Sequence, residues 1–274
     1  MVNKKRGYRE VVKMIITITN NRGGVGKSTT AQTLSVGLAL KGYKVLLVDL
    51  DTQCNTTSTF NASDNIKNIY RVIRGEIDIR DAIQHLEYID ILSSSKELIY
   101  ADDEFKKGDY QFKFHRLVAE QLDKVKSEYN YIIIDTAPNI SLITTNAIYS
   151  SDYVIIPMLA DMYSIEGLQT IQQQIYDINR GTDNKRVKIL GVLLTHYRGQ
   201  TTLNQTIRDT LEVITKQINT KLFNNLIRDS IIFSDSQFNK SVCLLRYPTH
   251  NATLDYIGFI DEIIKDTNGG KIYE

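Results

Sequence analysis

One stretch of the chain decides its fold: Asn21-Arg22-Gly23-Gly24-Val25-Gly26-Lys27-Ser28-Thr29, which directly follows a short apolar run and opens a segment of helical period. A glycine-rich turn between a strand and a helix points backbone N–H groups at phosphate oxygens, and the helix N-terminus adds partial positive charge. In such a loop Lys27 reaches the β- and γ-phosphates and Ser28 ligates Mg²⁺. The strict pattern GxxxxGK[ST] requires glycine where Asn21 stands, so the stretch departs from it at one position. We therefore expect a phosphate-binding loop formed by Gly23, Gly24, Val25, Gly26, Lys27, Ser28 and Thr29.

Around this stretch, apolar runs of strand length alternate with longer segments of helical period. The pattern predicts strands over residues 14–19, 44–50, 131–135, 153–158 and 187–195, and helices over residues 29–41, 112–127, 141–149, 165–179, 203–218 and 251–265. Between residues 61 and 108 the pattern is weaker and fits short helices over 66–74 and 79–86 and a strand over 88–92. The strands are continuous runs of Ile, Val and Leu, which is typical of a parallel sheet covered on both faces. We predict one doubly wound, mostly parallel α/β domain over residues 14–274, with helices on both faces and a basic leader at residues 1–13.

Composition excludes several classes of protein. The 274 residues are 42% hydrophobic and 24% charged, enough for a sizeable core and a charged surface. Cys54 and Cys243 lack the spacing of a zinc site, an iron–sulfur site or a disulfide framework, and fit a reducing cytosol. The apolar runs are far shorter than the roughly 18 residues of a spanning helix. We expect neither a membrane span nor an export signal.

Charge is balanced over the whole chain but not along it. Lys and Arg number 33 against 32 Asp and Glu, which gives no global reason to expect a nucleic-acid partner. Between residues 180 and 228, however, nine basic residues face three acidic ones, a local balance of +6. This segment is either a track for a DNA backbone or an ordinary solvated helical face. The leader, with Lys4, Lys5, Arg6, Arg9 and Lys13 against Glu10, is either a DNA-touching arm or a disordered start.

The loop resembles the deviant Walker A box of the ParA/MinD family of P-loop ATPases, KGGxGK[ST]T. Residues 49–55 resemble that family's acidic box DxDPQGN, and residues 131–138 resemble its Walker B strand and DxxP turn. Pro157, Ser164 and Glu166-Gly167-Leu168 match its switch and the following helix, and residues 191–195 match its late strand. The resemblance covers residues 14–256, nearly the whole chain, and implies ATP and Mg²⁺ as cofactors.

The resemblance also implies roles for single residues. Asp49 positions or activates the attacking water, with Asp51 nearby in the same box, and Asp135 holds Mg²⁺ through water. The implied metal set is Ser28, Asp135 and Asp49, and the implied catalytic set is Asp49, Lys27 and Arg22. Either aspartate alone is equally well explained as a helix N-cap. Thr52 and Cys54 replace the family's Pro and Gly, which leaves the local turn geometry open.

Arg22 stands at the family's signature lysine, which reaches the partner's nucleotide across a dimer. Arginine keeps the positive charge but replaces the compact ammonium of lysine with a planar guanidinium group. We expect ATP-dependent dimerisation with slow hydrolysis, Arg22 acting across the dimer. The alternative is a solvent-facing loop residue.

Within the family, the features favour the type that moves DNA. The tail over residues 260–266 is acidic, unlike the basic lipid-binding helix of MinD-type members. About thirteen residues precede the first strand, too few for a helix-turn-helix domain. The expectation is a short ParA-type partition ATPase, cytoplasmic and nucleoid-associated, which binds DNA nonspecifically as an ATP-bound homodimer. A centromere-binding, ParB-type adaptor protein stimulates hydrolysis and release. The alternative is a MinD-like positioning ATPase without DNA cargo.

The DNA-contact residues are the least defined part of the prediction. Residues 195–203 resemble the family's TxxxxRTNL string, but Gln200 replaces its arginine and Arg198 lies two positions earlier. The candidate DNA-binding residues are Arg198, Arg208, Arg228 and Lys240.

Overall fold

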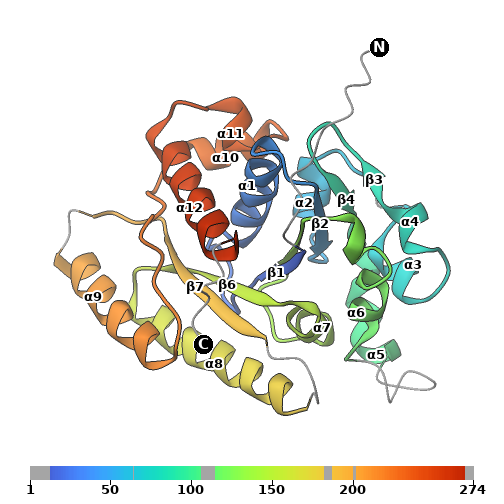
Figure 1. The fold of residues 1–274 in the computed structure, drawn as a ribbon, viewed down its shortest axis with the longest axis horizontal. Helices are drawn as coiled ribbons and strands as arrows, with labels where there is room; N and C mark the ends of the chain where they lie inside the picture. The colour runs from blue at the N-terminus through green and yellow to red at the C-terminus, as the bar shows by residue number, and fades with distance from the viewer. Residues whose placement is uncertain (1–12, 64, 106–114, 182–186, 200–201, 269–274) are drawn as a thin grey trace.

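The computed structural model describes residues 13–268 except 64, 106–114, 182–186 and 200–201 (Figure 1). The basic leader expected over residues 1–13 therefore lies outside the described residues, apart from Lys13. Among the described helices, none combines the length and the apolar content that a membrane crossing requires.

The described residues form one seven-stranded sheet with the order β3-β4-β2-β5-β1-β6-β7. Its strands are β1 (Met14–Ile18), β2 (Val45–Leu50), β3 (Gln84–His85), β4 (Asp90–Leu92), β5 (Tyr131–Thr136), β6 (Tyr153–Leu159) and β7 (Lys188–Thr195). All neighbouring strands are parallel except β3, which pairs antiparallel with β4. The predicted mostly parallel α/β sheet is confirmed.

The three central strands bring the chemistry-bearing positions to one edge of the sheet. Every residue of β2 and β5 is buried, as a strand covered on both faces requires. The register pairs Asp49 of β2 with Asp135 of β5, and Ile18 of β1 with the same Asp135. The loop after β1 and both aspartates therefore meet at the carboxyl ends of adjacent strands, where doubly wound folds bind ligands.

Helices cover both faces of the sheet (Figure 1). Their bounds are α1 (Lys27–Leu40), α2 (Asn55–Thr59), α3 (Ile69–Ile73), α4 (Ile79–Ala82), α5 (Ala101–Phe105), α6 (Leu117–Leu122), α7 (Leu142–Ser150), α8 (Met162–Arg180), α9 (Thr202–Gln217), α10 (Ile232–Phe238), α11 (Cys243–Arg246) and α12 (Asn251–Asn268), with 3-10 turns at Lys96–Tyr100 and Lys126–Glu128. Helices α1, α10, α11 and α12 pack on one face. Helices α3 to α7 pack on the other, and α8 and α9 extend that layer over β6 and β7.

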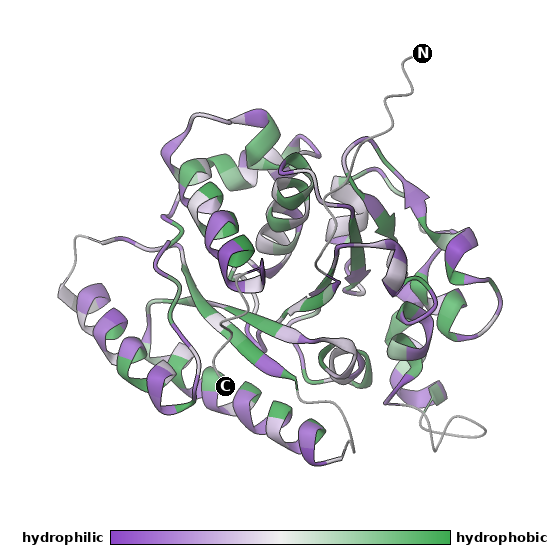
Figure 2. Cartoon of the chain, viewed as in Figure 1, coloured by the Kyte–Doolittle hydropathy of each residue, from purple (hydrophilic) through white to green (hydrophobic). Residues whose placement is uncertain are grey.

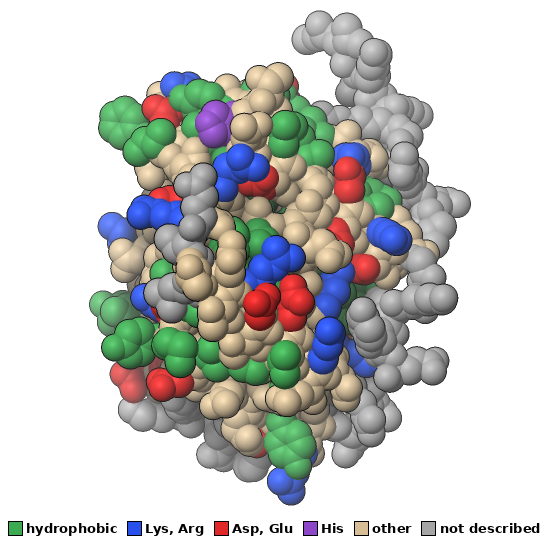
Figure 3. Space-filling model, turned by 90° about the vertical axis from the view of Figure 1, so that its left-hand side faces the viewer, with side chains coloured by type: hydrophobic (Ala, Val, Ile, Leu, Met, Phe, Trp, Pro, Cys, Tyr) green, Lys and Arg blue, Asp and Glu red, His purple; other side chains and the backbone are tan. Residues whose placement is uncertain are grey.

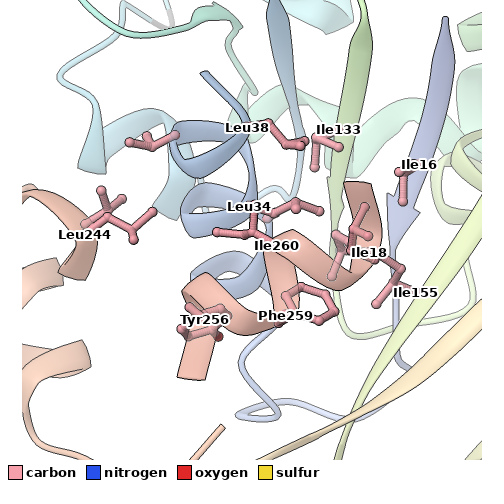
Figure 4. Close-up of a cluster of buried hydrophobic side chains, with 14 of the residues drawn as sticks. Ile16, Ile18, Leu34, Leu38, Ile133, Ile155, Leu244, Tyr256, Phe259 and Ile260 are labelled. Atoms are coloured by element: carbon pink, nitrogen blue, oxygen red, sulfur yellow. The ribbon is translucent and has the colours of Figure 1, made fainter. Parts of the chain in front are cut away.

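The core between α1, α12 and the sheet fixes the direction of the phosphate loop. Leu34 and Leu38 of α1 and Phe259 and Ile260 of α12 are buried together against apolar side chains of β1, β5 and β6 (Figure 4). A β-carbon at Gly37 would lie 2.2 Å from Cδ1 of Ile260, so this glycine allows the close approach of the two helices.

Helices α8 and α9 carry hydrophilic residues along their length, whereas strands β6 and β7, which they cover, are mostly hydrophobic (Figure 2).

The weakly patterned region and the last third differ in detail from the sequence expectation. The helix expected over residues 79–86 ends at Ala82, because Gln84 and His85 pair with β4 as an edge strand. The helix expected over residues 112–127 appears as α6 and a 3-10 turn, and residues 112–114 lie outside the described part of the chain. Helices α10 and α11 were not predicted, since segments of seven and four residues show little helical period.

Candidate functional site

The loop before α1 has the backbone shape that the glycine pattern predicts. Gly24 and Gly26 adopt φ of +73° and +79°, a left-handed conformation that favours glycine. The Gly26 carbonyl accepts the first helical hydrogen bond from Thr30 N at 2.8 Å. Thr195 at the end of β7 donates to the Val25 carbonyl at 2.9 Å and so supports the loop from the neighbouring strands. The amides at the start of α1 are free of side-chain caps, as an anion site at a helix N-terminus requires.

Lys27 places a cation inside the loop. Its side chain is buried, and Nζ donates to the Arg22 carbonyl at 2.7 Å, on the opposite side of the turn. Burial lowers the pKa of the Lys27 ammonium, while attraction by Asp135 and Asp51 opposes this shift. The ammonium is thus held between the loop and two carboxylates.

Asp135 is the residue before the last of β5, at the same edge of the sheet as the loop, and one of its oxygens is unpaired. The residue is 0% exposed; its Oδ2 accepts a hydrogen bond from the Thr56 hydroxyl at 2.7 Å, while Oδ1 has no hydrogen-bond partner. Burial raises the pKa of Asp135 and repulsion by Asp49 adds to the rise, whereas the hydroxyls of Thr56 and Ser28 act in the opposite direction. A buried, unsatisfied carboxylate oxygen beside the Ser28 hydroxyl fits a divalent cation.

Within the described residues, no three His, Cys, Asp or Glu side chains cluster as a metal cage. Mg²⁺ does not need such a cage, because it is commonly held by one or two carboxylates together with substrate phosphates. Ser28 and Asp135 therefore suit an ion that arrives with a nucleotide.

The two aspartates of the acidic box occupy different environments. Asp49 is 0% exposed, and its oxygens accept hydrogen bonds from Asp51 N at 3.0 Å and from Thr57 N and Oγ1 at 2.8 Å each. Burial raises the pKa of Asp49, and the backbone hydrogen bonds oppose the rise. Asp51, in contrast, lines the cavity next to Lys27 and Ser28. The Asp49 carboxylate thus binds groups of its own chain, whereas Asp51 lines the cavity.

The turn after Asp51 keeps its shape despite the departures at Thr52 and Cys54. Cys54 adopts φ of 53°, the left-handed conformation that glycine favours, and precedes α2. The side chain of Asp51 stabilises the same turn by accepting from Gln53 N at 2.9 Å.

Arg22 lies at the outer edge of the loop and is bound within its own chain. Its Nη1 donates to Oδ2 of Asp161, and the side chains are 42% and 31% exposed. Asp161 is also the N-cap of α8, since Oδ1 accepts from Ser164 N at 3.0 Å. Burial opposes ionisation of Asp161, but the hydrogen bonds from Arg22 and Ser164 hold its pKa below the usual range. One carboxylate therefore joins the phosphate loop to the start of α8.

A cavity of about 530 Å³ opens in front of the loop. Its polar side is formed by Gly23, Gly24, Gly26, Lys27, Ser28 and Asp51, and its less polar side by Ile227, Phe233 and Tyr256. Helix α10 is attached to the loop side by a hydrogen bond from Gln237 Nε2 to Thr29 Oγ1 at 3.0 Å. The Val25 side chain, which belongs to the same loop, is fully buried. The cavity thus joins a phosphate end to an apolar end.

Sequence reasoning missed the threonines that hold the acidic residues. Thr56 and Thr57 bind Asp135 and Asp49, and Thr57 Oγ1 also accepts from Ser94 N at 2.9 Å. The available signal was their position directly after the acidic box, at the start of a short polar helix. Asp161 carried a signal too, since Asp161-x-x-Ser164 before an apolar period is a helix start.

The candidate DNA-binding residues lie apart from the cavity floor, each with a partner in its own chain. Arg198 pairs with Asp229, Arg208 with Glu212 and Arg228 with Asp255, and Lys240 donates to Asn61 Oδ1 at 3.0 Å. Lys221 of the same basic segment is bound by Glu262 and Asp266. On the side of the molecule that carries α9, blue and red side chains lie interspersed rather than as one basic surface (Figure 3). Much of the net charge of +6 counted over residues 180–228 is therefore neutralised by acidic residues from outside that segment.

The fold and the loop together define the class of protein, a P-loop nucleotide-binding ATPase of the doubly wound α/β type. A family model described as an AAA domain matches residues 13–189. The chain is 30% identical over 253 residues to the sporulation initiation inhibitor protein Soj of Bacillus subtilis, covering 91% of this chain and 97% of that protein. It is 29% identical over 237 residues to the chromosome partitioning protein ParA of Caulobacter vibrioides, covering 84% and 86%. The chain belongs to the ParA/Soj family of partition ATPases.

Solved structures agree with this placement. A putative plasmid partition protein of Borrelia burgdorferi bound to AMPPNP superposes with a TM-score of 0.78 and 26% identity, over 92% of this chain and 99% of that one. Apo McdA of Cyanothece superposes with a TM-score of 0.81, over 92% and 99% of the two chains; at 19% identity it shows the shared fold. The family resemblance stated from the sequence is confirmed.

Proposed function

We propose that the protein is an ATP-hydrolysing molecular switch for DNA partition, with ATP and Mg²⁺ as its cofactors. The observation that carries the proposal is the pairing of a buried Lys27 with an unpartnered Asp135 oxygen at the phosphate end of a cavity. The related Borrelia protein, crystallised with AMPPNP, supports a nucleoside triphosphate as the ligand.

The residues divide the work of phosphoryl transfer to water. Lys27 and the loop amides hold the phosphates, and Ser28 and Asp135 hold the cation, which when bound neutralises charge on the β- and γ-phosphates. We assign the orientation of the attacking water to Asp51, because it faces the cavity, and give Asp49 the task of fixing the Asp51 backbone. The remaining requirement is neutralisation of charge in the transition state, for which Arg22 of a second copy is the candidate.

Exposed apolar side chains near the cavity support a nucleotide-dependent homodimer. Met162 and Tyr163 follow Asp161 and are 65% and 74% exposed. Ile231 precedes α10 and Phe238 is its last residue, and they are 79% and 88% exposed. Large apolar side chains gathered beside a ligand site are typical of an interaction surface. We propose that a second copy covers them when ATP is bound.

In this cycle the ATP-bound dimer holds DNA nonspecifically through basic residues, among them Arg198, Arg208, Arg228 and Lys240. Hydrolysis, stimulated by a ParB-type adaptor protein, releases the DNA. The place of action is the cytoplasm, on the nucleoid.

Phosphate release with ATP and Mg²⁺ tests the enzyme assignment, with Lys27→Ala as the blank. We expect Asp51→Asn to reduce turnover at least about a hundredfold while leaving nucleotide binding intact, since water orientation acts only in the transition state. Asp49→Asn should instead lower stability by about 1–3 kcal/mol, because its amide nitrogen would face backbone donors. Full turnover in Asp51→Asn would contradict the assignment of water orientation to Asp51.

DNA co-sedimentation with ATP, ADP or no nucleotide tests the cargo. We expect binding with ATP alone, falling steeply with salt. Equal binding in all three states, or none in any, would contradict the partition switch and leave a positioning ATPase without DNA cargo. Pelleting with anionic vesicles then tests that alternative.

A further inference from the structure

A chain of buried hydrogen bonds leads from the middle of α1 to the carboxylate of Asp135. Gln32 Nε2 donates to Thr56 Oγ1 at 2.8 Å, and Thr56 Oγ1 donates to Asp135 Oδ2 at 2.7 Å. Gln32 is 2% exposed, and Thr56 and Asp135 are 0% exposed. The three side chains come from α1, α2 and β5, and none of them is part of the phosphate loop.

The direction of this chain follows from donor chemistry. An amide nitrogen only donates, so the Thr56 oxygen accepts from Gln32 and its own hydrogen is directed to the carboxylate. Gln32 Nε2 also approaches Thr59 Oγ1 at 3.4 Å, which fixes the amide from a second point on α2. Thr56 has no freedom to turn its hydroxyl away without leaving two buried polar groups unpaired, at a cost of about 1–3 kcal/mol each.

The chain also selects which carboxylate oxygen is available. Oδ2 is occupied by Thr56, while Oδ1 is buried and has no hydrogen-bond partner. The Ser28 hydroxyl and the Lys27 ammonium both interact with the same carboxylate. Partners of this kind orient metal ligands in many sites, and their loss typically weakens metal affinity about 10–100-fold.

We infer that Gln32 and Thr56 are positioning residues that hold Asp135 with Oδ1 directed at the Mg²⁺ position. The inference rests on the proposed function, since it takes the nucleotide-bound cation as the ligand of Asp135. Thr56 fixes the carboxylate directly, and Gln32 acts through Thr56. Helix α2 and helix α1 are thereby joined to the Asp135 carboxylate by side chains alone.

The test compares the affinity of a fluorescent, non-hydrolysable ATP analogue in Mg²⁺ and in EDTA. In the wild type we expect the analogue to bind more tightly with Mg²⁺. In Thr56→Val, which keeps the side-chain shape, we expect the affinity in Mg²⁺ to fall by about 10–100-fold and the affinity in EDTA to stay within about twofold. Thr56→Ser restores the donor and should restore the Mg²⁺-dependent gain, which is the ratio of the affinity for the analogue in Mg²⁺ to that in EDTA. A general packing defect would lower both affinities and would not be rescued by serine.

Two further variants keep the inference falsifiable if Thr56→Val does not fold. Gln32→Leu removes the donor to Thr56, together with the longer contact to Thr59, and leaves Thr56 in place. It should lower the Mg²⁺-dependent gain by about 3–10-fold, because a freed hydroxyl orients the carboxylate less well. Thr33→Val is the matched control: it deletes a buried hydroxyl of α1 that contacts Cys243 Sγ at 3.9 Å, and the gain should be unchanged. An undiminished gain in folded Thr56→Val or Gln32→Leu overturns the inference. A wild type without any Mg²⁺-dependent gain would contradict the proposed function instead.

Discussion

Arg22 is held by a carboxylate of its own chain, although its proposed task lies in a second copy. Asp161 binds the guanidinium and caps α8 at the same time. Asparagine caps helices as well as aspartate does, so Asp161→Asn removes the charge and keeps the cap. An exposed ion pair is worth about 1 kcal/mol at most, so we expect turnover to rise by up to about fivefold.

Removing Arg22 itself should have the opposite effect. We expect Arg22→Ala to lower turnover at least about tenfold at saturating ATP, since an arginine directed at the transferred phosphate stabilises the transition state. Sedimentation velocity with ATP and a phosphate-release assay check both effects. Unchanged dimerisation and turnover in Arg22→Ala would show that Arg22 is only a solvent-facing loop residue.

The buried carboxylates make the metal-free protein sensitive to pH. Burial raises the pKa of Asp135 to about 7, and that of Asp49 is raised as well. The folded protein therefore keeps protons that the unfolded chain releases above pH ~4, and its stability falls as the pH rises from about 4 to about 7. At pH 8 we expect Asp135→Asn to be more stable than the wild type by roughly 1–3 kcal/mol, and near pH 5 the two should converge. Urea unfolding of both proteins in EDTA at pH 8 and pH 5 measures their free energies of unfolding. A difference in stability that is the same at both pH values would contradict the raised pKa of Asp135.

At the scale of elements, the central strands and the loop could be predicted because their signals are local. Strands β1, β2, β5, β6 and β7 are continuous apolar runs, and the glycines of the loop are needed for its φ angles. The hydrogen bond between Thr56 and Asp135 joins residues 79 positions apart, so no local pattern encodes it. For the same reason Asp49 could not be separated from Asp51 by sequence, since the hydrogen bonds of Asp49 to Thr57 depend on where α2 packs.

The packing of β7 against the following segment gives a prediction at this scale. A β-carbon at Gly191 would lie 2.6 Å from the Phe223 ring, which is itself packed edge-on against Phe259 with ring centroids 4.9 Å apart. We expect Gly191→Ala to lower the free energy of unfolding by about 1–3 kcal/mol. Gly167→Ala in α8 meets no atom within 4 Å and should raise it by about 0.5–1 kcal/mol. Urea unfolding of both variants checks the pair, and a neutral Gly191→Ala would show that the ring can move.

At the scale of the whole molecule, counting charges along the sequence overestimated the basic surface. The partners Asp229, Asp255 and Glu262 all follow the counted segment in the sequence and pair with its basic residues. The basic residues of this segment are thus partly neutralised within the chain, and in the proposed function a DNA backbone would compete with these carboxylates.

This competition predicts that removing a carboxylate strengthens DNA binding. We expect Asp229→Asn, which frees Arg198, to raise the affinity of the ATP-bound protein for nonspecific DNA by about 3–10-fold at low salt, with less gain as salt increases. Arg198→Ala should weaken it. Asp103→Asn makes the same charge change on exposed α5 and is the control. Equal gains from both aspartate variants would show an effect of net charge rather than of Arg198.

The cavity draws its residues from Gly23 to Tyr256, and the Tyr256 hydroxyl meets that of Thr30 at 3.0 Å across 226 positions of sequence. During synthesis, the phosphate loop leaves the ribosome long before α10 and α12, which complete the opposite side. Nucleotide binding should therefore stabilise the packing of α10 and α12 against the loop, because a ligand stabilises the state that contains its whole site. A fragment that stops after β7 therefore has the phosphate loop but lacks the apolar end of the cavity.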